Sequence, residues 1–253
     1  MKHIQKITLG IFTALIIPQL CGADMTFSVL NADTGTYAGN YTATGKAYKT
    51  GTGAAVFTGS NSFGTVEINA GTVSVGSASN LGNPTATIFN GSSVILKITD
   101  NINTGALTMT TAGTAQVQSG KTATLNAAPT GSNILSVNGA GTMAVASDLS
   151  GSSVPIAVSG SSTTLKVSGG SGKLPTAAIS VASGAILELG TSVANGAVPG
   201  IVNIASGAIV AVAAGVSAPS NVFSNATIPV FRGGSIIQLG ANSTFSQAIT
   251  VVA

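Results

Sequence analysis

The stretch ISVASGAILELG (179–190) and its neighbour VNIASGAIVAVA (202–213) decide the fold, because both follow one plan. Each begins with alternating apolar residues, turns at a glycine (Gly184 or Gly207) and continues as a second alternating segment. Alternation points successive side chains to opposite faces of a strand, with one face buried. Glycine at the turn adopts backbone angles that a Cβ would forbid. The two stretches therefore predict strand, corner and strand.

The same plan recurs along the chain. VEINAGTVSVG (66–76) is a third clear copy, and weaker copies are TIFNGSSVILKI (87–98), IAVSGSSTTLKV (156–167) and PVFRGGSIIQLG (229–240). Corner Gly71 is followed by Gly91, and corner Gly184 by Gly207. A repeat of about 20–24 residues, built only from short strands and turns, is typical of a β-solenoid. Stacked coils, about 4.8 Å apart, then share one continuous core.

Two other β architectures are alternatives. A sandwich would use antiparallel hairpins and usually larger core aromatics, and a membrane barrel would need longer strands with aromatic girdles. Aromatic residues are only 4% of the chain, and hydrophobic residues at 44% with little charge argue against disorder. Prolines recur at roughly coil intervals, as expected for loops between faces: Pro84, Pro129, Pro155, Pro175, Pro199, Pro219 and Pro229. We therefore predict an all-β, single-stranded parallel β-helix of about ten coils.

The N-terminus predicts export. Lys2 and Lys6 form a basic head, residues 7–17 are an apolar run, and small residues precede Asp24. This order is that of a secretory signal peptide over 1–23, cleaved after Ala23. The run is too short for a transmembrane helix, which needs about 20 apolar residues. Leu20 directly before the single Cys21 fits lipidation of that cysteine poorly.

Residues 51–82 carry a further ordered pattern. Its parts are Gly51-Thr52-Gly53, Gly59, Asn61, Phe63-Gly64-Thr65, Asn69-Ala70-Gly71-Thr72-Val73, Val75-Gly76, Ala78, Leu81 and Gly82. This pattern resembles the autotransporter-associated β-strand repeat of secreted passenger regions in Gram-negative bacteria. That family usually has a second glycine after the one matching Gly64, where this chain continues with Thr65. The match covers about one eighth of the chain, and the remainder only echoes it.

The resemblance implies a right-handed β-helix that is displayed at, or released from, the bacterial surface. Such passengers normally precede a translocator barrel, so we expect either a truncated passenger or an outer-membrane translocator barrel on another chain. The predicted organisation is a signal peptide at 1–23, an N-terminal cap or irregular first coil at 24–50, and a β-solenoid at 51–253. Tyr37, Tyr41 and Tyr48 are scattered through the second of these segments.

The chemistry-bearing residues predict no enzyme. Cleavage after Ala23 removes the only histidine and the only cysteine, so neither a Ser-His-Asp nor a cysteine nucleophile arrangement can form. The remaining acids are Asp24, Asp33, Glu67, Asp100, Asp148 and Glu188. Asp148 and Glu188 are the one candidate carboxylate pair, because their separation along the chain is close to two coils. Glu67 and Glu188 lie between apolar residues and are expected on the solvent face. No catalytic, cofactor or metal site is expected.

Two non-catalytic functions remain open. The first is an adhesive or structural surface passenger, whose partners are host or matrix glycans and proteins. The second is a self-assembling extracellular fibre or matrix protein, formed by end-to-end self-association. An apolar C-terminal segment, ITVVA (249–253), lacks the charges or proline that normally protect an edge strand. Charged residues are only 6% of the chain, without basic runs, so nucleic acid is not expected as a partner. A polysaccharide-degrading β-helix enzyme is a less favoured third reading.

Overall fold

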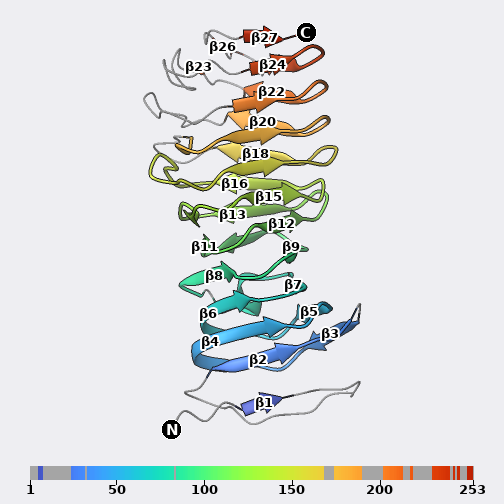
Figure 1. Cartoon of the computed structure of the whole chain (residues 1–253), viewed down its shortest axis with the longest axis vertical. Helices are drawn as coiled ribbons and strands as arrows, with labels where there is room; N and C mark the ends of the chain where they lie inside the picture. The colour runs from blue at the N-terminus through green and yellow to red at the C-terminus, as the bar shows by residue number, and fades with distance from the viewer. Residues whose placement is uncertain are drawn as a thin grey trace.

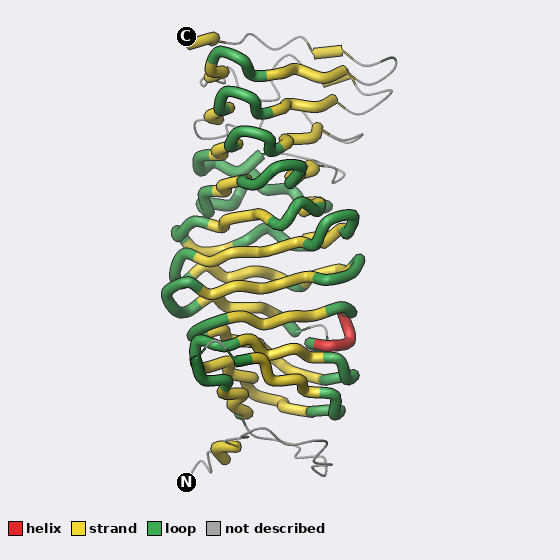
Figure 2. Tube along the Cα trace, turned by 90° about the vertical axis from the view of Figure 1, so that its right-hand side faces the viewer, coloured by secondary structure: helices red, strands yellow, loops and turns green. Residues whose placement is uncertain are grey.

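Parallel strands stack into a column whose termini lie at opposite ends (Figure 1). The computed structural model describes residues 5–7, 24–31, 33–82, 84–167, 174–189, 202–212, 217–218, 230–239, 242, 244–245 and 250–252. Every strand pairing within these residues joins one coil to the next in parallel. Figure 2 shows the strands along the sides of the column and the connecting loops at its edges. The predicted β-solenoid is therefore confirmed, and the sandwich of antiparallel hairpins is excluded.

Three long sheets and one short sheet make up the described column. Sheet A contains β1 (Gln5–Ile7), β2 (Met25–Ser28), β4 (Thr42–Thr50), β6 (Ser62–Ile68), β8 (Ala86–Phe89), β11 (Ala106–Met109) and β14 (Thr130–Gly131). Sheet B contains β3 (Thr34–Tyr37), β5 (Ala54–Phe57), β7 (Thr72–Val75), β9 (Val94–Ile98), β12 (Gly113–Val117), β15 (Leu135–Asn138), β17 (Ile156–Val158), β19 (Ile179–Val181), β21 (Val202–Ile204), β24 (Val230–Arg232) and β27 (Thr250–Val252).

Sheet C joins the column later along the chain. It contains β10 (Ile102–Thr104), β13 (Thr122–Leu125), β16 (Thr142–Val145), β18 (Thr164–Val167), β20 (Ile186–Leu189), β22 (Ile209–Val212) and β25 (Ile236–Leu239). The short sheet D pairs β23 (Ser217–Ala218) with β26 (Thr244–Phe245). Sheet B runs the length of the column, whereas sheet A covers its N-terminal part and sheet C its C-terminal part. The 3₁₀-helix η1 (Ala78–Asn80) lies in contact with β10, the first strand of sheet C.

The predicted corners form where the glycines were expected. Gly71, Gly184 and Gly207 have φ of +70°, +75° and +73°, a region that residues with a Cβ rarely adopt. Gly71 is also a point of close approach, because a Cβ there would overlap the carbonyl oxygen of Gly53. In the weaker copy over 87–98 we expected the corner at Gly91. The residue with the left-handed φ there is Ser93, at 59°. Gly91 is required instead by packing, since a Cβ would overlap the Asn69 carbonyl.

The column has about eight turns, where we expected about ten. Coil length is less uniform than the glycine spacing suggested. The pairing of Ala54 with Thr72 closes a short coil, whereas the pairing of Asn203 with Val230 closes a much longer one.

The interior is a stack of aliphatic columns, as the alternation predicted. In sheet C, one such column contains Ala123, Met143, Leu165, Leu187 and Val210, all buried. Burial of each of the larger side chains in this column stabilises the fold by roughly 1.5–3 kcal/mol relative to exposure. The described N-terminal coils have an aromatic interior instead: Phe27 packs edge-on against Tyr37, Tyr41, Phe57 and Phe63.

Most of the predicted signal peptide, 1–23, lies outside the described residues. The exception is β1, which pairs in parallel with β2 at the N-terminal end of sheet A. The 24–50 segment carries β2, β3 and β4, which continue sheets A and B towards that end.

Candidate functional site

A group of polar side chains from successive coils lies on the outer face of sheet A. Glu67 on β6 accepts hydrogen bonds from the Nζ of Lys46 on β4 and from the Nδ2 of Asn90 after β8, both at 2.8 Å. Asn90 Nδ2 also donates to Asn69 Oδ1 at 3.1 Å. Three consecutive coils thus meet at one carboxylate. We call Lys46, Glu67, Asn69 and Asn90 the sheet A polar cluster.

The electrostatics of this cluster favour a fixed ion pair. The carboxylate of Glu67 raises the pKa of the Lys46 amine above its usual range, mainly through their hydrogen bond. Lys46 also lies 5.8 Å from the ring centre of Tyr48. Glu67 points outward, as predicted, but it is not solvent-exposed: its residue is only 8% accessible. That part of the expectation was wrong, because side chains of the coils on either side cover the carboxylate.

Two other acids pair in the same way, with a lysine one coil away. Glu188 Oε1 lies 2.7 Å from Lys166 Nζ, and these residues are direct partners on β20 and β18. Asp100 Oδ1 lies 2.9 Å from Lys121 Nζ, and this hydrogen bond lowers the pKa of the Asp100 carboxyl. All three carboxylates face a cation, which suits surface pairing between coils rather than proton transfer.

The register does not place the candidate carboxylate pair in one column. Glu188 stacks over Lys166, and Lys166 stacks over Ala144. Asp148 lies beyond Ala144, in the loop after β16, where its Oδ1 accepts the Ser150 amide at 2.8 Å. The spacing along the chain matched two coils, but the two acids occupy different positions within their coils.

Lys49 was not anticipated as a buried charge. It lies on the inner face of β4, between Phe27 and Ile68 in one column, and is 1% accessible. Its Nζ donates to the carbonyl oxygens of Thr50, Gly51 and Ala70 at 2.9, 2.6 and 3.0 Å. Burial lowers the pKa of this amine to about 8. The amine therefore supplies hydrogen-bond donors to three backbone carbonyls that point inward at this corner. A sequence signal existed, since Lys49 shares the alternation of the buried Ala47.

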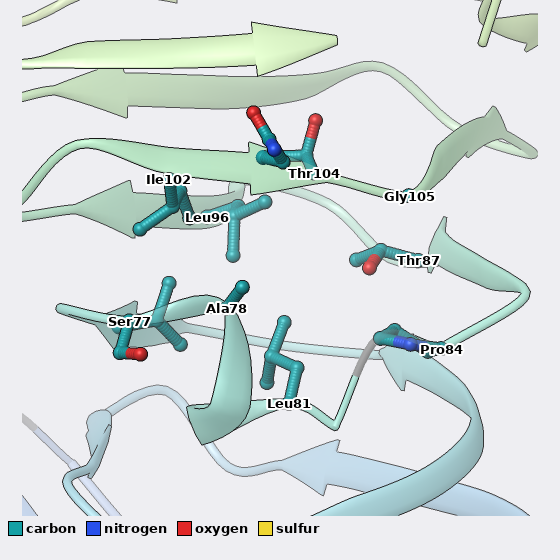
Figure 3. Close-up of a pocket in the computed structure, with 11 residues that line it drawn as sticks. Ser77, Ala78, Leu81, Pro84, Thr87, Leu96, Ile102, Thr104 and Gly105 are labelled. Carbon is teal, nitrogen blue, oxygen red and sulfur yellow. The ribbon is translucent and has the colours of Figure 1, made fainter. Parts of the chain in front are cut away.

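A cavity of about 20 Å³ lies between η1 and the start of sheet C (Figure 3). Leu81, Leu96 and Ile102 supply apolar lining, and Thr87 and Thr104 supply hydroxyl groups. The volume is about that needed by a single water molecule. It is too small for a sugar or a nucleotide.

The described residues contain no group of three or more histidine, cysteine or acidic side chains placed to hold a metal ion. Within the same part of the chain, no helix has the length and apolar character needed to cross a membrane. Comparison of the chain with family models, curated proteins and solved structures finds no significant match.

Proposed function

We propose that the chain is an exported, non-catalytic β-helical passenger protein that acts as a rigid scaffold at the bacterial surface or outside the cell. Its handedness is proposed to be right-handed, and its role adhesive or structural. Glycans or proteins of a host or matrix are the proposed partners, and the proposed export route ends at an outer-membrane translocator barrel on another chain. The resemblance of residues 51–82 to the autotransporter-associated β-strand repeat supports this export route.

One observation carries the scaffold role. The outward column of sheet B stays in register from coil to coil: Thr34, Ala54, Thr72, Ile95, Thr114, Ser136, Ala157, Ser180 and Asn203. Most of these side chains are uncharged and short, and many carry hydroxyl or amide groups. A face of this kind can form many weak hydrogen bonds at the coil spacing, about 4.8 Å apart. Such repetition suits multivalent contact, in which affinity grows with the number of engaged sites.

Export is tested by expressing the whole chain in a Gram-negative host and sequencing the N-terminus of the recovered protein. We expect Asp24 as the first residue, in the medium or on the cell surface. A Leu15→Arg variant, which breaks the apolar run, should keep the chain inside the cell with Met1 in place. Recovery of Met1 on the wild-type chain would contradict the proposal.

Adhesion is tested with the exported chain on arrays of glycans and matrix proteins. Asn203→Lys and Ser180→Lys change exposed positions of the sheet B column. Each should weaken binding, and the double variant should weaken it more than either single variant. Asn103→Lys, on an exposed position of β10 in sheet C, is the matched control. Equal binding by all variants would show that this face of sheet B does not bind the partner, and would favour a structural role over an adhesive one.

A further inference from the structure

A second outward column runs along sheet B, beside the one described above. It contains Val56, Ser74, Lys97, Gln116 and Asn138, which are direct partners from coil to coil. After Val56 every member carries a polar group: a hydroxyl, an amine and two carboxamides. We call Ser74, Lys97, Gln116 and Asn138 the sheet B polar column.

The side chains of this column have no partners among the residues that the structure describes, since none of the four forms a side-chain hydrogen bond or ion pair there. The other lysines with described side chains differ in this respect. Lys46, Lys121 and Lys166 each pair with an acid of another coil. Lys49 donates to three backbone carbonyls. Lys97 is exposed, so its three N–H donors are free to bind a ligand.

Asn138 adds an unsatisfied acceptor to the column. Its Oδ1 is buried and accepts no hydrogen bond from any described residue. A buried acceptor without a donor is costly, and native proteins have few of them. The stem of Gln116 packs across the same coil boundary, since a Cβ at Gly139 would lie 3.0 Å from Gln116 Cγ. The two carboxamides therefore follow Lys97 in register, ready to exchange hydrogen bonds with one extended ligand.

The charge on this face has one sign. Within the strands of sheet B from β3 to β21, Lys97 is the one charged residue. Asp100 follows β9 on the same coil, but its carboxylate already pairs with Lys121. Lys97 is therefore an unbalanced positive charge on a neutral, hydroxyl-rich face. Such a charge attracts an anionic group.

The surroundings of Lys97 favour a glycan over a peptide or a nucleic acid. The backbone groups of β9 and β12 already bind the strands on either side, so a peptide cannot add as a further strand. Outward positions on these strands carry no aromatic side chain of the kind that usually anchors a peptide. A single lysine is too little charge for nucleic acid, whose binding depends on many phosphate contacts.

We propose that the sheet B polar column binds an acidic glycan, with the carboxylate of a uronic acid residue on the amine of Lys97. Gln116 and Asn138 exchange hydrogen bonds with the hydroxyl groups of the adjoining sugar, and one of these hydroxyls donates to Asn138 Oδ1. Thr72 and Thr114, in the neighbouring outward column, contribute further hydroxyl contacts. The inference rests on the proposed adhesive role, to which it adds the chemical class of the partner, and it does not depend on export.

The experiment compares immobilised polygalacturonate with the same polymer after reduction of its carboxyl groups. Biolayer interferometry of the purified whole chain measures both affinities. We expect the acidic polymer to bind about fivefold more tightly at low salt. In 1 M salt, where the screening length is about 3 Å, the two affinities should converge. Equal affinities at low salt, or binding to neither polymer, would overturn the inference.

Lys97→Gln locates the charge. It should lower the affinity for polygalacturonate about fivefold, to that of the reduced polymer. Lys166→Gln is the matched control, because it makes the same change in net charge on the outer face of sheet C, and its affinity should equal that of the wild type. Equal losses for the two variants would show a response to net charge alone and would contradict the site. Circular dichroism of each variant should show an intact column.

Gln116→Ala tests the direction of the glycan along the column. It should weaken binding of both polymers, since the carboxamide of Gln116 contacts hydroxyl groups that reduction leaves in place. An unchanged affinity would contradict this placement.

Failure of this inference can be told from failure of the adhesive role. Adhesion on the glycan and protein arrays without a preference for acidic glycans would overturn the inference alone. Absence of binding to every glycan and matrix protein would overturn both. Tighter binding of poly-glutamate than of polygalacturonate would identify an acidic peptide as the partner and would contradict the glycan.

Discussion

Asn61 and Asn80, about one coil apart in the chain, share one buried corner, where Asn61 Nδ2 donates to the carbonyl oxygen of Asn80. The Oδ1 of Asn80 accepts the amides of Gly76 and Ser77 at 2.9 and 2.8 Å, and its Nδ2 donates to Gly59 at 3.0 Å. Asn61 Oδ1 in turn accepts the amide of Tyr41. The side-chain amides of Asn61 and Asn80 thus form hydrogen bonds with backbone groups that the strand ladders leave without partners.

Asn80→Ala should therefore lower the free energy of unfolding by about 2–3 kcal/mol, since it leaves several buried backbone groups without partners. Urea unfolding monitored by circular dichroism measures the change. Asn203→Ala is the matched control, because Asn203 is exposed on β21, and its effect should stay within about 0.5 kcal/mol. Equal losses of unfolding free energy for Asn80→Ala and Asn203→Ala would contradict the stabilising role of the corner amides.

Gly71→Ala and Gly120→Ala separate two roles of glycine. Both residues have nearly the same positive φ, +70° and +72°, but a Cβ at Gly120 would meet nothing within 4 Å. Gly120→Ala should cost about 1 kcal/mol from backbone strain alone. Gly71→Ala should cost about 3 kcal/mol or more, because the carbonyl of Gly53 must also move. Similar melting temperatures for both variants would contradict the close approach at Gly71.

Lys49 should make the column more stable as pH rises from about 7.5 to 9.5. The buried amine has a pKa of about 8, against 10.5 for an ordinary lysine. In this window the unfolded chain binds more protons than the folded one, so the free energy of unfolding increases with pH. Above the window, Tyr37 and Tyr41 act in the opposite direction to Lys49: burial raises their pKa values, so stability falls as the unfolded chain ionises.

Lys49→Met is the control for this effect. It replaces the amine with an apolar side chain of similar length and should remove most of the increase between pH 7.5 and 9.5. Urea unfolding at several pH values gives the slope for both chains. An unchanged slope in Lys49→Met would assign the effect to another group.

The two glutamate–lysine pairs should differ in strength. The side chain of Glu67 is 10% exposed and also accepts from Asn90, whereas that of Glu188 is 25% exposed. Glu188→Ala should cost about 0.5 kcal/mol and Glu67→Ala about 2 kcal/mol. Repeating the unfolding in 1 M salt should reduce the first loss more than the second. A larger loss for Glu188→Ala would show that exposure does not govern these pairs.

The sequence was enough to predict the strand–corner–strand units, because alternation and a corner glycine are local signals. Gly71, Gly184 and Gly207 formed their corners as expected. The coil number could not be read in the same way. The pairing of Ala54 with Thr72 and that of Asn203 with Val230 close coils of different length, so a uniform repeat length does not give the number of turns.

Interactions between coils were the least predictable part of the molecule. Lys46, Glu67 and Asn90 meet only because three coils are in a particular register. A shift of one residue would turn each of these side chains to the other face. The separation of Asp148 from the column of Glu188 has the same origin, since a repeat length does not fix the position of a residue within its coil.

The variable coil length also shapes how the column would respond to mechanical force. The hydrogen bonds between coils lie roughly along the long axis, perpendicular to the strands. Tension applied to the two termini would therefore peel coils away one at a time, rather than shear a whole sheet at once. Each step would release a single coil of slack, short where Ala54 pairs with Thr72 and long where Asn203 pairs with Val230.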